Sequence, residues 1–396
     1  MDKSYLLVTG IFRSGTTWLA RALNANRYIS FESDPVAPIF NSFRYDLAKK
    51  RKKNKRIKRF SPLGDYFGDS SEFIKDILES NFEIPVDKKN LDIVFRKIKK
   101  KNLPFENGFW TETFNGFKNC KNYKQSILSV LNHIKNISKK KSKVIGFKEV
   151  WINEMAGAFL NTFKKSKVIL IVRDPRAILA SRNAMIKKYP PVFIGRQWRK
   201  SVLIANYLRK RYQKRILILK YEDATLNKYL TLKKICKFLN VRFDNKMVDE
   251  NYYKDGLGNP WKQNSSFTLE GKKYLLNAKE TKKISIKFKK NYLKKNTKTN
   301  NEKWKTELDK KDVLTIEFLC HEEMKKFGYK LKNSLKKLSK FNIEDYKKIK
   351  INQLADWIRP YTEDRNNVQI KKIIKQEKNR KKLLKKKLLS FSNHIF

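Results

Sequence analysis

The chain has 396 residues, with 93 Lys and Arg against 38 Asp and Glu, which gives a formal net charge of +55 at pH 7. Its length allows one large domain or two ordinary ones, and a hydrophobic fraction of 40% supports a real core. Because the basic residues are spread over the whole chain, the charge alone does not favour a nucleic-acid-binding protein. A positive surface still favours an anionic nucleotide and an acidic acceptor.

The three cysteines, Cys120, Cys236 and Cys320, lie too far apart for a metal-binding motif, so we expect no metal site. Their sparse, odd number suits a reducing compartment. No apolar run reaches the length of a membrane span. The chain also enters its first predicted strand without room for a signal peptide. These features predict a cytoplasmic protein.

Residues 5–26, YLLVTGIFRSGTTWLARALNAN, predict a strand, a glycine loop and a helix. Gly10 and Gly15 bracket the loop, and a helical pattern starts at Thr16. This arrangement points backbone N–H groups and a helix N-terminus at a bound phosphate. The spacing is that of a Walker A loop, but Thr16 stands where that loop requires Lys, and the cation is Arg13, inside the loop.

A second motif occupies residues 167–185, KVILIVRDPRAILASRNAM. An apolar run predicts a buried parallel strand that ends at Arg173. Asp174 and Pro175 then start a helix as its N-cap and first residue, and Ser181 is expected two turns into it. By itself the segment could be a plain strand-to-helix turn, or Asp174 could be a Walker B acid.

Together, and in this order, RSGTTW and RDPRAILAS resemble the two phosphate motifs of the sulfotransferases that use 3′-phosphoadenylyl sulfate (PAPS), in the style of bacterial and carbohydrate-type members. The resemblance runs from about residue 5 to 330. It implies transfer of a sulfuryl group from PAPS to a hydroxyl or amine, without a metal, and release of adenosine 3′,5′-bisphosphate. The preferred acceptor is a saccharide, as a glycan or a glycolipid, and a lipid head group or a protein tyrosine stays open.

The resemblance also implies roles for individual residues. Arg13 would lie at the 5′-phosphate and the bridging oxygen, while Arg173 and Ser181 would bind the 3′-phosphate. Trp18 would contact adenine, although core packing competes for it. The C-terminal segments 264–271 and 301–308 would close over the nucleotide. The remaining donor-site candidates are Ser14, Gly15, Thr16, Thr17, Ser265, Ser266, Trp304 and Lys305.

The acceptor needs a general base within hydrogen-bond reach. The three histidines do not fall where some family members place that base, whereas others use a Glu that follows the phosphate loop. Glu32 lies at the end of a predicted strand that starts near Tyr28, where ligands of α/β sheets bind, and is our candidate. Glu112 and Glu149 are the reserves, and Lys148 is either near the acceptor or at a solvated strand end.

Further strands are predicted at 143–150 and 215–224, and the second closes with Tyr221, Glu222 and Asp223 as a structural strand end. Helices are predicted at 151–163, 229–239 and 316–329. The alternation predicts an α/β, P-loop-like, three-layer fold in which helices flank a central, mainly parallel sheet. We expect a sulfotransferase domain at 1–330. Residues 331–396 would form a basic, helical extension, which is favoured to be solvated and could instead meet a membrane surface or a partner.

Two other classes of function remain open from the residues alone. A small-molecule kinase would use the Walker-like spacing with ATP and Mg²⁺, although Thr16 in place of Lys argues against it. A basic nucleic-acid-binding protein would show steeply salt-dependent binding.

Overall fold

The computed structural model describes residues 4–34, 36–50, 71–101, 114–150, 152–181, 189–254, 268–269, 272–273, 301–342 and 366–385. Its centre is a five-stranded sheet with the order β2-β3-β1-β4-β5, in which every pairing is parallel. The strands are β1 (Ser4–Gly10), β2 (Ile29–Ser33), β3 (Val144–Lys148), β4 (Lys167–Val172) and β5 (Ile216–Lys220). Both strands that flank β1 come later in the chain, so the glycine loop that follows β1 leaves the middle of the sheet.

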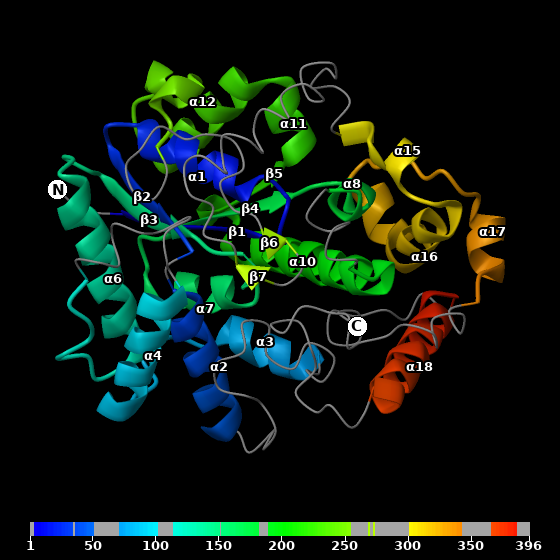
Figure 1. Cartoon of the computed structure of the whole chain (residues 1–396), viewed down its shortest axis with the longest axis horizontal. Coiled ribbons are helices and arrows are strands. Elements are labelled where there is room, and N and C mark those ends of the chain that lie inside the picture. The colour runs from blue at the N-terminus through cyan, green and yellow to red at the C-terminus, as the bar shows by residue number, and fades with distance from the viewer. Residues whose placement is uncertain are drawn as a thin grey trace.

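Helices cover both faces of this sheet (Figure 1). On one face lie α1 (Thr16–Ala25), α11 (Tyr221–Leu226) and α12 (Lys228–Leu239). The other face is covered by α2 (Ala37–Lys50), α3 (Ser71–Glu79), α4 (Lys88–Lys101), α6 (Tyr123–Ser138), α7 (Met155–Thr162) and α10 (Pro191–Tyr212). The expected three-layer α/β fold with a parallel sheet is therefore confirmed.

The remaining elements extend this frame. Beyond β4 are α8 (Pro175–Leu179), α15 (Trp304–Glu307), α16 (Lys310–Lys326) and α17 (Leu335–Lys340). Short 3₁₀ helices are η1 (Gln213–Arg215), η2 (Asn245–Met247) and η3 (Glu250–Tyr252), and a separate antiparallel pair is formed by β6 (Thr268–Leu269) and β7 (Lys272–Lys273). The C-terminal helix is α18 (Asn366–Lys385).

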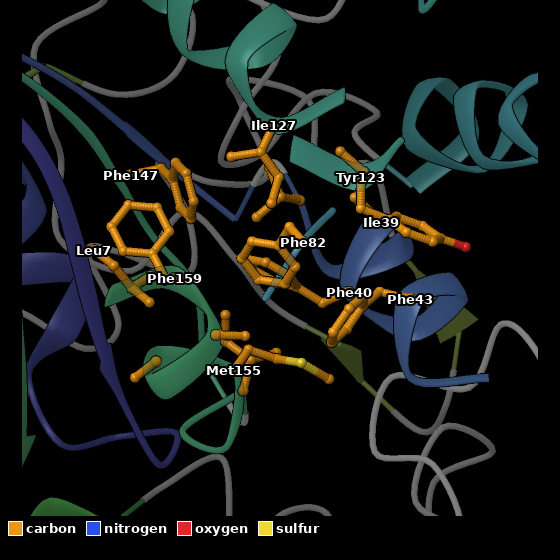
Figure 2. Packing of buried hydrophobic residues seen from close by; sticks show 14 of the residues in the cluster. Leu7, Ile39, Phe40, Phe43, Phe82, Tyr123, Ile127, Phe147, Met155 and Phe159 are labelled. Atoms are coloured by element: carbon orange, nitrogen blue, oxygen red, sulfur yellow. The ribbon is translucent and has the colours of Figure 1, made fainter. Parts of the chain in front are cut away.

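Aromatic side chains dominate the core beneath the sheet (Figure 2). Phe82, just after α3, stacks on Phe40 at a centroid distance of 5.5 Å and meets Phe43 edge-on at 4.8 Å. Phe147 on β3 meets Phe159 on α7 edge-on at 5.9 Å. Offset and edge-to-face rings are the favoured geometries for aromatic pairs. This packing holds α2, α3 and α7 against the sheet. It therefore fixes the position of the edge strand β2, after which α2 starts.

The expectation of a solvated C-terminal extension is wrong for α18. Ile374, Glu377 and Arg380 are at most 7% exposed. Glu377 accepts hydrogen bonds from Arg196 and Arg199 of α10, and Arg380 donates to Glu323 of α16 at 2.8 Å. The sequence pattern of α18 is that of a solvated basic helix, because the buried residues described in it include an acid and a base whose partners lie far away in the chain.

Candidate active site

The glycine loop, residues 11–15, is our candidate phosphate loop and joins β1 to α1 at the carboxyl edge of the sheet. Arg13 and Gly15 both adopt left-handed backbone conformations, with φ of 63° and 93°. The Ser14 hydroxyl donates to the carbonyl of Ile11 at 2.5 Å, which closes the loop on itself. No described side chain caps α1, and its first turn carries no acid. The free N–H groups and the positive end of the helix dipole therefore suit an anion.

Both loop glycines are required by close packing. A Cβ atom at Gly15 would lie 2.3 Å from Cδ2 of Tyr221, and one at Gly10 would lie 2.6 Å from the carbonyl oxygen of Ile171. The positive φ at Gly15 is a second reason for glycine at that position. The loop therefore rests directly on the ends of β4 and β5.

Arg173, the first residue after β4, ties the second motif to the phosphate loop. Its Nη1 donates to the carbonyl of Arg13 at 2.8 Å, and its guanidinium lies 4.5 Å from the centroid of the Tyr221 ring. The indole N–H of Trp198 on α10 donates to the carbonyl of Arg173 at 2.7 Å. The structure thus brings together two motifs that are 160 residues apart in sequence.

Ser181 lies beyond α8, rather than two turns inside a longer helix as expected. The helix ends at Leu179, and the backbone N–H of Ser181 donates to the carbonyl of Ile178 at 3.1 Å. The Oγ atom of Ser181 is buried and has no hydrogen-bond partner among the described residues. Buried polar atoms are normally satisfied, so this hydroxyl fits a group that binds beside it.

Asp174 is the N-cap of α8, as expected, and accepts a hydrogen bond from the backbone N–H of Arg176 at 2.8 Å. Both of its carboxylate oxygens also accept from the Arg176 guanidinium, at 3.0 and 2.7 Å. Arg176 is buried, and its Nη1 donates to Glu317 of α16 at 2.6 Å. Asp174 is therefore committed to a structural ion pair, which argues against a role as a Walker B acid.

The Tyr-Glu pair directly after β5 contributes to the site, although the sequence indicated only a structural strand end. Tyr221 contacts both the loop at Gly15 and the guanidinium of Arg173. Glu222 accepts from the backbone N–H of Asp174 at 2.9 Å and from the hydroxyl of Tyr329 at 3.0 Å. Burial raises the pKa of Glu222. The position of these residues at the end of a sheet strand was the signal that could have found them.

The C-terminal candidates are only partly brought to the site. Trp304 is buried, and its ring centroid lies 3.8 Å from Cζ of Arg176, so α15 packs against α8. Lys305 is half-exposed and pairs with Glu302 at 2.5 Å. Ser265, Ser266 and the reserve base Glu112 lie outside the described residues.

The carboxylates near the end of β2, the edge strand of the sheet, have different surroundings. Glu32 is half-buried on β2 and is in register with Phe147. Glu149 is buried, and its Oε2 accepts from the backbone N–H groups of Val36 and Ala37, each at 2.9 Å. It therefore fixes the start of α2, which favours a structural role over that of a base.

Lys148 and Asp34 form a buried ion pair at the same edge. The backbone N–H of Asp34 also donates to the carbonyl of Lys148 at 2.6 Å, so the ends of β2 and β3 are held together twice. Lys148 is thus not a solvated strand end. At the other end of β2, Lys140 donates to the carbonyl of Ile29 at 3.0 Å; burial lowers the pKa of Lys140 to about 8, and the charge of Glu32 partly opposes that shift.

The residues on the first turn of α1 differ in how deeply they are buried. Thr16 is buried, whereas Thr17 and Trp18 are half-buried. Trp18 packs against the hydrophobic cluster that contains Leu19 and Tyr253. Core packing therefore accounts for at least part of this tryptophan.

The residues that the structure describes contain no group of three or more metal-ligating side chains. The same part of the chain has no helix that is long and apolar enough to cross a membrane.

A sulfotransferase family model matches residues 6–245, a span that includes the phosphate loop, Arg173, Ser181 and the Tyr-Glu pair. The chain therefore belongs to the sulfotransferase family. No curated protein matches the sequence.

Several solved sulfotransferase structures match the chain at low sequence identity. The sulfotransferase domain of the Synechococcus PCC 7002 olefin synthase is 16% identical, with 83% of this chain and 96% of that chain covered and a TM-score of 0.44. The sulfotransferase domain from the curacin biosynthetic pathway is 17% identical, with 83% and 99% covered and a TM-score of 0.45. A sulfotransferase from Alicyclobacillus acidocaldarius is 13% identical, with 81% and 97% covered and a TM-score of 0.31.

Proposed function

We propose that this sulfotransferase moves a sulfuryl group from PAPS to a hydroxyl or amine of a saccharide, carried by a glycan or glycolipid. The junction between the phosphate loop and Arg173 is the observation that carries the proposal. A donor with phosphates at both its 5′ and 3′ positions needs two anion sites at a fixed separation. The bond from Arg173 to the Arg13 carbonyl and the shared contact with Tyr221 supply a rigid connection between two such sites.

At the 5′ end, the loop N–H groups of Ser14 and Gly15 and the hydroxyls of Thr16 and Thr17 would hold the phosphate. The guanidinium of Arg13 would stabilise charge on the leaving oxygen, as in other loose group-transfer reactions. Trp18 would contact the base. The uncapped start of α1 and the glycine cradle fit this assignment.

At the 3′ end, Arg173 would bind phosphate oxygens through its planar fork. The buried Ser181 hydroxyl would add a second donor, which would explain why the described residues leave it without a partner. Lys305 would approach from α15, which already packs on α8 through Trp304. Ser265 and Ser266 stay candidates from the sequence alone.

For the acceptor, we propose Glu32 as the general base that takes the proton from the attacking hydroxyl or amine. Two observations favour it over the other carboxylates at this edge. The Glu149 carboxylate is occupied by two backbone N–H groups, and Asp34 is paired with Lys148. A cytoplasmic location is proposed with this function, since the three cysteines form no disulfide.

Calorimetric binding of adenosine 3′,5′-bisphosphate without Mg²⁺ tests the donor site. Loss of a charge-assisted phosphate contact should weaken the affinity of Arg173→Ala by about 10- to 100-fold. Arg209→Ala removes an exposed arginine near the end of α10 and serves as the matched control. Absence of bisphosphate binding to the wild type, combined with Mg²⁺-dependent ATP binding, would restore the kinase interpretation.

The base is tested separately with a panel of saccharide acceptors. Glu32→Gln should lower kcat by roughly 10²- to 10⁴-fold while bisphosphate affinity stays unchanged. Glu149→Gln is the comparison, because it alters a neighbouring carboxylate that already caps a helix. A wild-type kcat in Glu32→Gln would remove Glu32 from the mechanism.

A further inference from the structure

Apolar side chains gather on one exposed part of the molecule. In the described part of the chain, five large hydrophobic residues are exposed, and four of them lie within residues 226–252. They are Leu226 (73% exposed), Tyr229 (44%), Leu230 (58%) and Tyr252 (49%), which we call the α12 patch. Scattered single apolar residues are normal on a surface, but a local group of four is a sign of an interaction site.

Lysines outnumber acids around these apolar residues, and the exposed Glu250 beside Tyr252 pairs with Lys228 at 3.3 Å. Helix α12 carries Lys228, Lys233, Lys234 and Lys237 and has no acidic residue. Lys233, Lys234 and Lys237 are exposed, and they follow Leu230 at helical spacing on the outer side of the helix. The inner side of α12 packs in the core through Leu232 and Ile235. The helix is therefore amphipathic, but its outer side is itself a mixture of apolar and cationic groups.

Two lysines, one on α12 and one on η2, lie over the exposed tyrosines. Lys233 Nζ is 4.4 Å from the ring centroid of Tyr229, and Lys246 Nζ is 5.1 Å from that of Tyr252. Tyrosine and lysine both have an apolar body and a polar end, which suits them to the boundary between water and lipid.

We propose that the α12 patch docks on an anionic lipid surface. The leucines and tyrosine rings would enter the boundary between headgroups and acyl chains, and the lysine ammonium groups would pair with lipid phosphates and carboxylates. Contact with a second copy of the chain is disfavoured, because it would bring two lysine-rich faces together. Nucleic acid would leave Leu226 and Leu230 without an apolar partner.

The place of the patch gives it a consequence for the site. Helix α11 starts at Tyr221, which contacts the phosphate loop at Gly15, and ends at Leu226 in the patch. Because one six-residue helix separates the patch from the loop, docking would hold the candidate site close to the headgroups, where a glycolipid acceptor would be presented. The lipid-binding inference itself does not depend on the proposed sulfuryl transfer.

Co-sedimentation of the full chain with vesicles tests the proposal. The vesicles are phosphatidylcholine alone, or phosphatidylcholine with phosphatidylserine as roughly a third of the lipid. We expect binding to the anionic vesicles only. Leu226→Ser combined with Leu230→Ser should weaken that binding by about tenfold or more. Leu335→Ser, which changes the exposed leucine outside the patch, is the matched control and should bind like the wild type.

A second pair of variants tests the charge. Replacement of Lys233, Lys234 and Lys237 by Gln should weaken binding by about 100-fold at low salt, from the usual contribution of each lysine near an anionic surface. The control replaces three other exposed lysines, Lys88, Lys89 and Lys118, and should have little effect. All substituted side chains are exposed, so circular dichroism should show unchanged folding.

Three results would overturn the proposal. The first is no binding of the wild type to anionic vesicles. The second is equal loss in patch and control variants, which would mean that the overall charge of the protein is responsible. The third is unchanged vesicle binding by the patch variants together with loss of self-association or of binding to an RNA oligonucleotide. That result would assign the patch to a protein or nucleic-acid contact.

Discussion

Glu377→Gln should destabilise the protein strongly, because Glu377 is the acid that neutralises two buried arginines. Its carboxylate accepts from Nη2 and Nη1 of Arg199 at 2.7 and 2.9 Å and also pairs with Arg196. All three side chains are at most 3% exposed. Removal of one partner from a buried ion pair costs about 3–5 kcal/mol, because it leaves an uncompensated charge in the interior.

The pKa of Glu377 gives an independent magnitude. Burial by itself would raise this pKa, but Arg199 and Arg196 outweigh burial and lower it from 4.5 to about 2. A shift of this size corresponds to about 3 kcal/mol of stability at pH 7. Because the pKa is depressed in the folded state, this contribution is complete above about pH 4.5. It is lost as the pH falls towards 2.

Urea unfolding followed by tryptophan fluorescence measures the effect at pH 7 and at pH 3. We expect Glu377→Gln to lower the free energy of unfolding by about 3 kcal/mol at pH 7. The decrease should be much smaller at pH 3, because protonation of the wild-type carboxylate weakens its ion pairs there. Glu322→Gln changes a more exposed acid on α16 and should cost less than about 1 kcal/mol. A variant that matches the wild type at pH 7 would show that α18 is not held by this ion pair.

Three further changes test the site. Gly15→Ala places a methyl group 2.3 Å from the Tyr221 ring in a left-handed backbone conformation, so bisphosphate affinity should fall more than about tenfold in calorimetry. Trp198→Phe leaves the Arg173 carbonyl without its donor, and urea unfolding should show a loss of about 1–3 kcal/mol; an unchanged midpoint would contradict this bond. Glu149→Gln should cost about 1 kcal/mol in thermal unfolding with bisphosphate affinity unchanged, and a loss of affinity would give Glu149 a role at the nucleotide instead.

Several elements of the fold could be predicted from short stretches of the sequence. Apolar runs bounded by glycine, proline or charge predicted the five strands of the central sheet within a few residues, because a buried parallel strand must be apolar on both faces. The Asp174–Pro175 pair predicted the start of α8, because an N-cap acceptor before a residue of fixed φ is a local arrangement. The strand, loop and helix at the start of the chain were predictable for the same reason.

The length of α8 was not predictable from its own residues. Its pattern allowed a longer helix with Ser181 inside it, but the helix ends at Leu179. Two distant residues, Glu317 on α16 and Trp304 on α15, hold the Arg176 side chain of this helix in place. These contacts fix where α8 packs, and tertiary context of this kind overrides local helix propensity.

The sequence by itself predicted the α/β fold class and the sulfotransferase family. The tertiary structure decided which carboxylates at the β2 edge are already occupied, that Tyr221 joins the phosphate loop to Arg173, and that α18 is docked rather than solvated. Each of these depends on pairs of residues far apart in the chain. Secondary structure depends on neighbouring residues, whereas the pairing of buried charges depends on which surfaces the completed fold brings together.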